Sequence, residues 1–423
     1  MENAKIGEFA ACVGIDWADK EHEVRMLEVE SGKRESLTLK QEPEAVASWV
    51  QGLRERFGGR RIAVALEQRK GALIHALMGY EILVLYPVNP KTVAKIREAF
   101  YTSGSKSDPV DAELLLDIVT QHRDKLRAWV PDKARTRLLQ ALVEERRNLV
   151  DEKTRLKNRL RSTLKEYFPQ ALEWVGELDS IQAMDFLGKW PTLESVQRAK
   201  TETVRKFFAE HGHRNLDRIE GRVKAIEAAK ELTKDFAIVT AGKMKVQTVV
   251  AQMRPLVKWI AEYNQQIAEL FESHPDREVF SSFPCAKDVL APRLLVAFGE
   301  DRSRYDDALE IQSFSGIAPV TKKSGQSRVV EKRLACPKFV RQTFQEYAAQ
   351  SIKKRGWARN YYLRLRARGV KHYAAVRAVA YKWIRIMYRC WQEQAPYSEE
   401  QYMQSLIRAG SPLASGLCLA TAV

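Results

Sequence analysis

The chain has 423 residues, of which 45% are hydrophobic and 29% charged, and its formal net charge is +16. This length predicts two or three domains, each able to bury a core of its own. No apolar run is long enough to cross a membrane, and no signal-peptide pattern is present. We therefore expect a cytoplasmic protein, and the membrane and secreted classes are excluded.

Cysteine and histidine give no sign of a disulfide framework or a zinc site. The five cysteines are scattered, odd in number and without metal-ligand spacing, which indicates reduced thiols. One close histidine pair, His211 and His213, has no cysteine or carboxylate frame around it.

The first ninety residues predict an α/β domain with a mixed sheet. Strands are expected at 11–18, 21–30, 35–40, 61–67 and 81–88, and helices at 42–57 and about 71–78. The first three strands are joined by short connections and should be antiparallel. The fourth is a continuous apolar run, as expected for a strand buried on both faces.

Two acids stand at the ends of strands that should be neighbours. Asp16 closes the first strand and Glu67 closes the fourth. Sites in open α/β sheets gather at the carboxyl ends of strands. These two carboxylates are therefore expected at one edge of the sheet.

A second pair of acids, Asp108 and Asp111, lies in the stretch Lys106-Ser107-Asp108-Pro109-Val110-Asp111-Ala112. Asp108 is a suitable N-cap, Pro109 suits a first helical turn, and residues 112–119 read as a helix with an apolar face. Asp108 and Asp111 are three apart, so both carboxylates should leave the same side of the helix start. Two carboxylates so close repel each other unless a cation or a shared proton lies between them. The alternative interpretation of this pair is a capped, acidic first turn without a metal ion. Together with Asp16 and Glu67 it gives four hard oxygen ligands of the kind that Mg²⁺ prefers.

At this point the chain resembles the DEDD-type insertion-sequence transposases, the bridge-RNA-guided serine recombinases. The resemblance rests on Gly14-Ile15-Asp16-Trp17-Ala18, Ala65-Leu66-Glu67, Asn89-Pro90 and the stretch 106–112. It implies a RuvC-like domain of RNase H fold at residues 8–130. It further implies that Asp16, Glu67, Asp108 and Asp111 are the catalytic, Mg²⁺-binding acids. Gln68-Arg69 departs from the commoner Ala/Pro-Thr-Gly.

Residues 131–275 are expected to form a helical, coiled-coil region. A charged helix with a leucine stripe covers 132–168, and a heptad pattern runs from Val246 to Leu270, with Pro255 expected to kink or break it. The pattern fits a helical hairpin that packs on itself, an intermolecular coiled coil, or both. Residues 170–240 are helical without a motif.

A basic, mainly helical domain is expected at 276–400, followed by a tail at 401–423. An apolar helix at 289–298 ends at Gly299, and the turn before it resembles the family's Pro-Gly-hydrophobic-Gly helix–hairpin–helix turn. Cys285 and Ala286-Lys287 stand where that turn usually has glycines, so we do not expect a working phosphate hairpin.

The stretch Lys322-Lys323-Ser324-Gly325 resembles the family's Ser-Gly segment, in which the serine is the nucleophile. The resemblance assigns that role to Ser324, and Ser327 and Ser315 are the alternatives. Gly325 permits a sharp turn that would present the hydroxyl. Without the resemblance, a serine in a basic turn would be unremarkable. Flanking cations would attract a scissile phosphate, namely Lys322, Lys323 and Arg328.

The positive charge is concentrated in residues 320–390, where 19 lysines and arginines face two acids and account for essentially the whole net charge. Two or three helices are expected at 338–393. Aromatic residues are interleaved with the cations, which favours a nucleic-acid partner over a simply solvated face. The expected contacts include Arg364, Arg366 and Arg368.

The combined interpretation is an RNA-guided DNA recombinase of the insertion-sequence type. The resemblance implies a phosphoserine intermediate, Mg²⁺, a guide (bridge) RNA, target and donor DNA, and a homodimer that assembles to a tetramer. Two other classes stay open: a metal-dependent hydrolytic nuclease resembling a Holliday-junction resolvase, and a non-catalytic nucleic-acid-binding protein. A covalent protein–DNA adduct would discriminate the first of these from the recombinase.

Overall fold

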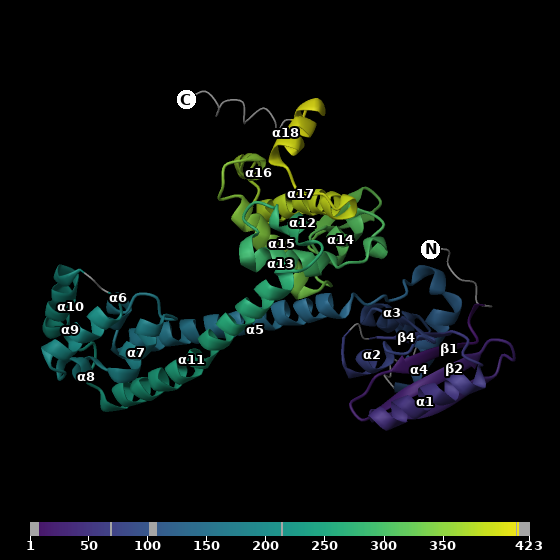
Figure 1. Cartoon of the computed structure of the whole chain (residues 1–423), viewed down its shortest axis with the longest axis horizontal. Coiled ribbons are helices and arrows are strands. Elements are labelled where there is room, and N and C mark those ends of the chain that lie inside the picture. Colours follow the sequence, from purple (N-terminus) through teal and green to yellow (C-terminus); the bar gives the residue numbers. More distant parts are fainter. Residues whose placement is uncertain (1–7, 68–69, 101–107, 213–214, 412, 414–423) are drawn as a thin grey trace. The chain divides into compact units, whose positions relative to one another are not determined.

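The computed structural model describes residues 8–67, 70–100, 108–212, 215–411 and 413. They form two compact units, residues 1–131 and 132–423, which we call the N-terminal and C-terminal units and describe separately (Figure 1). Parts of three predicted features, Gln68-Arg69, Lys106-Ser107 and the end of the tail, lie outside the described residues, as does His213.

The N-terminal unit is built on one five-stranded mixed sheet. Its strands are β1 (Ala11–Asp16), β2 (Glu21–Glu28), β3 (Arg34–Lys40), β4 (Ile62–Leu66) and β5 (Leu83–Pro87), in the order β3-β2-β1-β4-β5. β2 pairs antiparallel with β1 and β3, whereas β4 runs parallel to β1 and β5. The predicted three antiparallel strands followed by parallel ones are confirmed.

Helices cover both faces of this sheet. They are α1 (Pro43–Arg56), α2 (Ala72–Leu77), α3 (Pro90–Phe100) and α4 (Asp108–Gln121), with a 3₁₀ turn, η2 (Arg123–Lys125). α1 and α2 pack with Val13, Ile15 and Val64 on one face, and α3 and α4 pack with Ala63 and Ala65 on the other. All five residues of β4 are buried, which explains its uninterrupted apolar sequence.

A long helical hairpin forms the spine of the C-terminal unit. Its arms are α5 (Ala134–Tyr167) and α11 (Phe236–Glu272), which pack side by side in opposite directions (Figure 1). The heptad residues of α11 therefore face a helix of the same chain. α11 continues through Pro255 as one helix, so Pro255 does not break it, and a kink there stays a prediction. An additional contact between chains stays a prediction.

Five helices join the arms at one end of the hairpin: α6 (Ala171–Trp174), α7 (Ile181–Lys189), α8 (Leu193–Gln197), α9 (Thr201–Glu210) and α10 (Leu216–Ala228). They share one apolar core with the adjoining parts of α5 and α11. Side-chain caps start several of them. Ser180 accepts a hydrogen bond from the backbone of Ala183, and Thr192 and Ser195 form a reciprocal capping box.

The other end of the hairpin carries the basic part of the unit. Its elements are α12 (Arg277–Ser281), α13 (Lys287–Phe298), η3 (Arg302–Arg304), α14 (Ala308–Phe314), β6 (Val320–Ser324), β7 (Ser327–Glu331), α15 (Lys338–Ser351), α16 (Trp357–Ala367), α17 (His372–Glu393) and α18 (Glu399–Arg408). Trp357, Trp383 and Trp391 are fully buried in its core. Two or three basic helices were expected at 338–393, and α15, α16 and α17 lie there. α18 was not expected, because its residues were assigned largely to the tail.

None of the helices in the described parts of the chain is both long enough and apolar enough to cross a membrane.

Candidate active site

The parallel pairing of β1 and β4 places the first two acids at one edge of the sheet. Ile15 lies opposite Leu66 in the register of these neighbouring strands. Asp16 and Glu67, the next residue in each case, therefore follow side by side at the carboxyl ends. This part of the predicted site depends only on strand order, which the sequence pattern indicated.

Helix α4 lies directly on the backbone of β1. At Gly14 a Cβ atom would come within 2.3 Å of the backbone oxygen of Ala112 and within 2.3 Å of the backbone nitrogen of Leu116. Real Cβ atoms do not approach other atoms so closely, so only glycine allows this contact. The residue two positions before Asp16 thus fixes how closely α4 approaches the strand.

Contacts further along show which way α4 runs. Thr120 is hydrogen-bonded to the thiol of Cys12, whose pKa is raised by burial, with this bond opposing the rise. Just beyond α4, the guanidinium carbon of Arg123 lies 4.8 Å from the centre of the Phe9 ring. The end of α4 therefore lies toward the amino end of β1. Its first turn, with Asp108, lies toward the carboxyl end, on the side of Asp16.

The two acids of α4 differ in environment. Asp111 is 1% exposed, and its Oδ1 accepts both Nε of Arg97 at 2.6 Å and Nη2 at 2.5 Å. Asp108 is exposed. The prediction that both carboxylates leave the helix on the same side stays a prediction, but their burial differs. Asp111 lies four residues before Leu115 and seven before Ile118, so it continues the buried stripe of the helix.

Carboxylate oxygens are ligands of the kind that Mg²⁺ prefers, and Asp16, Glu67 and the first turn of α4 lie toward one edge of the sheet. No group of three or more His, Cys, Asp or Glu residues in the described ranges is arranged to hold a metal ion, however. The guanidinium of Arg97 in α3 forms an ion pair with one of these acids, Asp111. The sequence pattern gave no signal for this arginine.

A buried histidine fixes the loop that follows Asp16. His22 in β2 is fully buried, its Nδ1 accepts a hydrogen bond from the backbone of Ala18 at 3.3 Å, and Nε2 lies 2.5 Å from Oε1 of Gln41. An amide N–H can only donate, so Nδ1 carries no proton and Nε2 donates to Gln41. Burial lowers the pKa of His22, against these two hydrogen bonds. The sequence pattern placed His22 in a strand but missed this role.

Ser324 lies at the tip of an exposed β-hairpin in the C-terminal unit. β6 and β7 pair antiparallel, with Ser324 opposite Ser327 and the two residues Gly325 and Gln326 forming the turn. Gly325 has a φ of 55°, the left-handed conformation expected for the first residue of a type II′ turn. The sharp turn predicted at Gly325 is confirmed.

The alternative serines differ in accessibility. Ser315 is fully buried and its hydroxyl donates to the backbone oxygen of Gln312 at 3.1 Å, so it cannot meet a macromolecular substrate. Ser324 and Ser327 are both exposed. The cations around them are exposed as well, and Lys322 forms an ion pair with Glu331 at 2.8 Å. Lys323 lies opposite Arg328 across the hairpin.

The turn before α13 keeps a glycine-like backbone without glycine. Cys285 has a φ of 68° and Lys287 a φ of 43°. Both values lie in the left-handed region that residues other than glycine rarely adopt. These are two of the positions at which the resemblance places glycines. The backbone shape is therefore retained at some conformational cost.

The basic helices expose the arginines expected to contact nucleic acid. Arg364, Arg366 and Arg368 are exposed near the end of α16, and Tyr373 at the start of α17 is 81% exposed. The opposite side of α17 is buried, as its apolar pattern predicted. Figure 1 shows α16 and α17 in the same part of the C-terminal unit, where they pack against each other.

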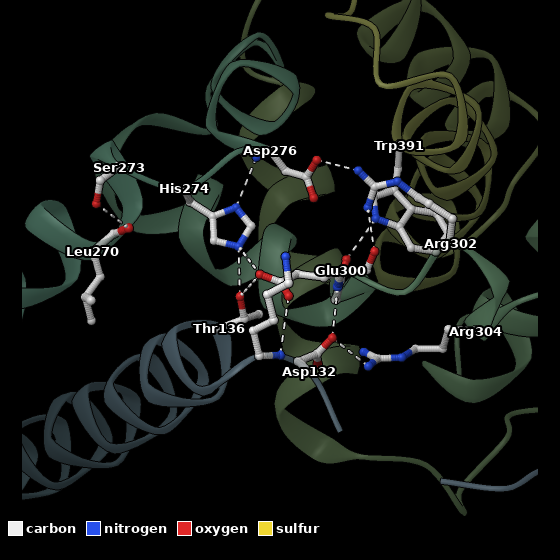
Figure 2. Close-up of polar contacts among 12 residues, drawn as sticks. Asp132, Thr136, Leu270, Ser273, His274, Asp276, Glu300, Arg302, Arg304 and Trp391 are labelled. Atoms are coloured by element: carbon white, nitrogen blue, oxygen red, sulfur yellow. Dashed lines mark hydrogen bonds and ion pairs between the residues drawn. The ribbon is translucent and has the colours of Figure 1, made fainter. Parts of the chain in front are cut away.

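A buried polar network at the start of α5 was not foreseen (Figure 2). The His274 side chain is fully buried, with Nε2 at 2.9 Å from Oγ1 of Thr136 and 3.2 Å from Oε1 of Glu300. Its Nδ1 accepts the backbone N–H of Asp276 at 3.1 Å, so the proton lies on Nε2. Thr136 in turn donates to Glu300 at 2.5 Å. His274 thus cannot serve as a base for Thr136, and the group acts as a structural clasp.

Ion pairs extend this clasp to the basic helices. Asp132 pairs with Arg304 at 2.7 Å and accepts the backbone N–H of Glu300 at 2.9 Å (Figure 2). Arg302 pairs with Asp276 and stacks over Trp391, 4.8 Å from the ring centre. The first residues of the C-terminal unit are therefore anchored to α17. The sequence did not predict this network, because His274 and Glu300 are far apart in the chain and form no motif.

Known families match both parts of the chain. Residues 13–169 match a DEDD-type model described as a transposase, and residues 277–363 match a model described as the transposase IS116/IS110/IS902 family. The first match includes all four acids, and the second includes Ser324.

Individual proteins match nearly the full length. The mini-circle protein of Streptomyces coelicolor that is named as a transposase for IS117 is 25% identical over 94% of this chain and 98% of its own. The 44.8 kDa insertion-element protein of IS116 from Streptomyces clavuligerus is 25% identical over 89% and 93%. The 42 kDa protein of IS900 from Mycobacterium paratuberculosis is 23% identical over 91% and 96%. Because the two family models match in order and the likeness extends across the whole chain, the protein belongs to the IS116/IS110/IS902 family of transposases.

Proposed function

We propose that this transposase is an RNA-guided DNA recombinase that cuts and rejoins DNA through a covalent bond to Ser324. The observation that carries the proposal is the position of this hydroxyl at an exposed, positively charged hairpin tip. A serine there can approach the phosphate of a duplex without rearrangement of a protein core. Lys322, Lys323 and Arg328 supply the charge that attracts such a phosphate.

The proposed step replaces one phosphate ester by another. Oγ of Ser324 forms a bond to phosphorus, the bond from phosphorus to one deoxyribose oxygen breaks, and that oxygen takes up a proton. The Oγ proton passes to solvent or to a carboxylate of the acidic set. Rejoining reverses these events with a different DNA hydroxyl. No water enters, so the energy of the broken ester is kept in the protein–DNA bond.

Asp16, Glu67, Asp108 and Asp111 are proposed to hold Mg²⁺. When bound, this ion neutralises charge on the attacked phosphate. The sheet of the N-terminal unit, in which β2 is antiparallel to β1 and β3 while β1, β4 and β5 are parallel, supports an RNase H-like fold for it. The acids belong to the N-terminal unit and Ser324 to the C-terminal unit, so strand transfer requires residues from both.

Guide RNA, target DNA and donor DNA are the proposed partners, and a dimer that assembles to a tetramer is the proposed active form. The exposed arginines of α16 and the interleaved aromatics support a polyanionic partner. These cations would contact the phosphate backbone of a nucleic acid. Such contacts suffice when base pairing with a guide RNA selects the DNA sequence.

The test is a trapped reaction on DNA with RNA that co-purifies with the protein. Wild type should give a protein–DNA adduct attached through Ser324. Ser324→Ala should give none, while nucleic-acid binding remains. Ser327→Ala is the matched control, because this residue is also exposed and lies directly across the turn, and it should keep the adduct.

Cleavage by Ser324→Ala at the wild-type rate, with no adduct in any protein, would replace the proposal with a hydrolytic nuclease. An adduct that disappears only in Ser327→Ala would move the nucleophile to that residue. Binding without any cleavage or adduct under all metal conditions would favour the non-catalytic class.

A further inference from the structure

The contact between Arg97 and Asp111 is a deeply buried ion pair of the N-terminal unit. Two guanidinium nitrogens approach the same oxygen, Oδ1, at 2.5 and 2.6 Å. The Asp111 side chain is 1% exposed and that of Arg97 is 17% exposed. Other ion pairs of this unit, such as Arg25 with Glu113, lie nearer the surface.

Burying a carboxylate is costly in free energy unless a cation is paired with it. Arg97 supplies that cation from α3, across the interface with α4. The same carboxylate is one of the four acids to which we assign Mg²⁺. Both contacts of Arg97 go to Oδ1, and the positive charge of its guanidinium opposes a second cation at the same carboxylate.

We propose that Arg97 is a positioning residue that holds Asp111 in the metal-free protein and competes with Mg²⁺ for this carboxylate. This inference rests on the proposed metal site but concerns a residue outside it. In the metal-free state the pair joins α3 to α4. A metal ion bound in place of Arg97 would also supply a positive charge to Asp111.

The exchange has a thermodynamic consequence. The observed metal affinity of the wild type is the intrinsic affinity of the carboxylates reduced by the cost of opening the ion pair. Removing Arg97 removes that cost, so metal should bind more tightly. The same change leaves Asp111 without a cation in the absence of metal, so the metal-free protein should become less stable.

The experiment compares the full-length wild type with Arg97→Ala and Arg97→Lys. Isothermal titration with Mg²⁺, repeated with Mn²⁺, gives the affinities, and melting curves with and without metal give the stability. Arg97→Ala should bind Mg²⁺ about tenfold more tightly or better, as expected for release of a buried pair. It should melt below wild type without metal and gain more from added metal. Arg97→Lys keeps one cationic nitrogen and should lie between the two, which covers the case in which Arg97→Ala does not fold.

A double-mutant cycle with Asp111→Asn separates this role from a general effect on folding. The gain in metal affinity from Arg97→Ala should disappear in the Asp111→Asn background. Equal affinities for wild type, Arg97→Ala and Arg97→Lys, with binding lost in Asp16→Asn, would overturn the role of Arg97 and leave the metal site standing. No metal binding in any variant would overturn both.

Discussion

Two acids three residues apart can have unrelated roles in the metal-free protein. Asp108 and Asp111 look equivalent in the sequence, yet Asp111 is buried against Arg97 and Asp108 is exposed. The spacing identified the pair, and the apolar residues at Leu115 and Ile118 indicated the buried stripe that Asp111 joins. The sequence could not indicate the partner, because Arg97 comes from another helix.

Neutralising these two acids should therefore affect stability differently. Asp111→Asn leaves the largely buried Arg97 without a counter-charge and should lower the free energy of unfolding by about 2–3 kcal/mol. This is less than the usual cost of breaking a fully buried pair, because the Arg97 side chain keeps some exposure to solvent. Asp108→Asn should change it by no more than about 0.5 kcal/mol. Urea unfolding of both variants without metal measures this. Equal effects would mean that the ion pair is absent in solution. Both substitutions should abolish strand exchange.

Histidines that look ordinary in the sequence hold two connections of the fold. His22 fixes the loop after Asp16, and His274 fastens the start of α5 to Glu300. Burial lowers the pKa of each, although neighbouring groups, Asp276 and Glu300 in the case of His274, oppose it. A proton on Nδ1 would also face a backbone N–H, so charging breaks a hydrogen bond in both cases.

Stability should fall as the pH drops below about 6.5, the usual pKa of histidine. A group whose pKa is lowered by folding binds its proton more readily in the unfolded chain, so acid favours unfolding. Melting temperatures between pH 7.5 and 5 should show the decline. His274→Gln can still accept the N–H of Asp276 and donate to Glu300, and should flatten the profile. His75→Gln, at an exposed position, should leave the profile unchanged.

At the scale of elements, the approach of α4 to β1 depends on one missing side chain. The Gly14 backbone lies against Ala112 and Leu116, and the helix that carries Asp108 and Asp111 can sit there only for this reason. Strands and helices were predictable from hydrophobic periodicity, usually within two residues. This contact was not, because periodicity describes one element and the clash involves two.

Gly14→Ala should destabilise the N-terminal unit by at least about 2 kcal/mol, since the added Cβ would meet backbone atoms at 2.3 Å and those atoms cannot rotate away. Gly52→Ala is the matched control. Gly52 is an exposed residue inside α1 with nothing within 4 Å of a Cβ, and alanine there should stabilise by about 0.5–1 kcal/mol. Denaturant unfolding gives both values. A neutral Gly14→Ala would mean that α4 lies further from the sheet.

The element pattern also shows where a motif can mislead. Cys285 and Lys287 replace expected glycines, which suggested that the turn before α13 had changed, yet both residues adopt left-handed φ values. Residues of α12, of the turn and of α13 are buried in the same core. Conversely, a hairpin as short and exposed as β6–β7 has little packing of its own, so its sequence alone could place Gly325 but not the strands around it.

For the whole molecule, the distribution of charge and chemistry between the units was largely predictable. The four candidate metal-binding acids occur before residue 131, and the excess of lysine and arginine lies after residue 320. Both facts can be read from the sequence without a structure. The heptad pattern of α11 could not decide its partner, because a seam of this kind suits a helix of the same chain as well as one from another. Within the chain that partner is α5.

The cations of α16 should contribute to nucleic-acid affinity by neutralising phosphates. Replacing Arg364, Arg366 and Arg368 together with alanine should weaken binding and reduce the slope of log affinity against log salt. The reduction should be about 0.9 for each duplex phosphate that the variant no longer neutralises. The measurement is a binding titration at several salt concentrations with duplex DNA and with RNA.

A control of equal charge decides whether position matters. Replacing Lys206, Arg218 and Lys224 with alanine removes three exposed cations from α9 and α10, in the opposite end of the α5–α11 hairpin. It changes the net charge by the same amount, but it should leave the slope within the error of the wild-type value. A similar decrease in slope in both triple variants would show that affinity follows net charge alone. A slope unchanged in the α16 variant would place those three arginines away from the bound phosphates.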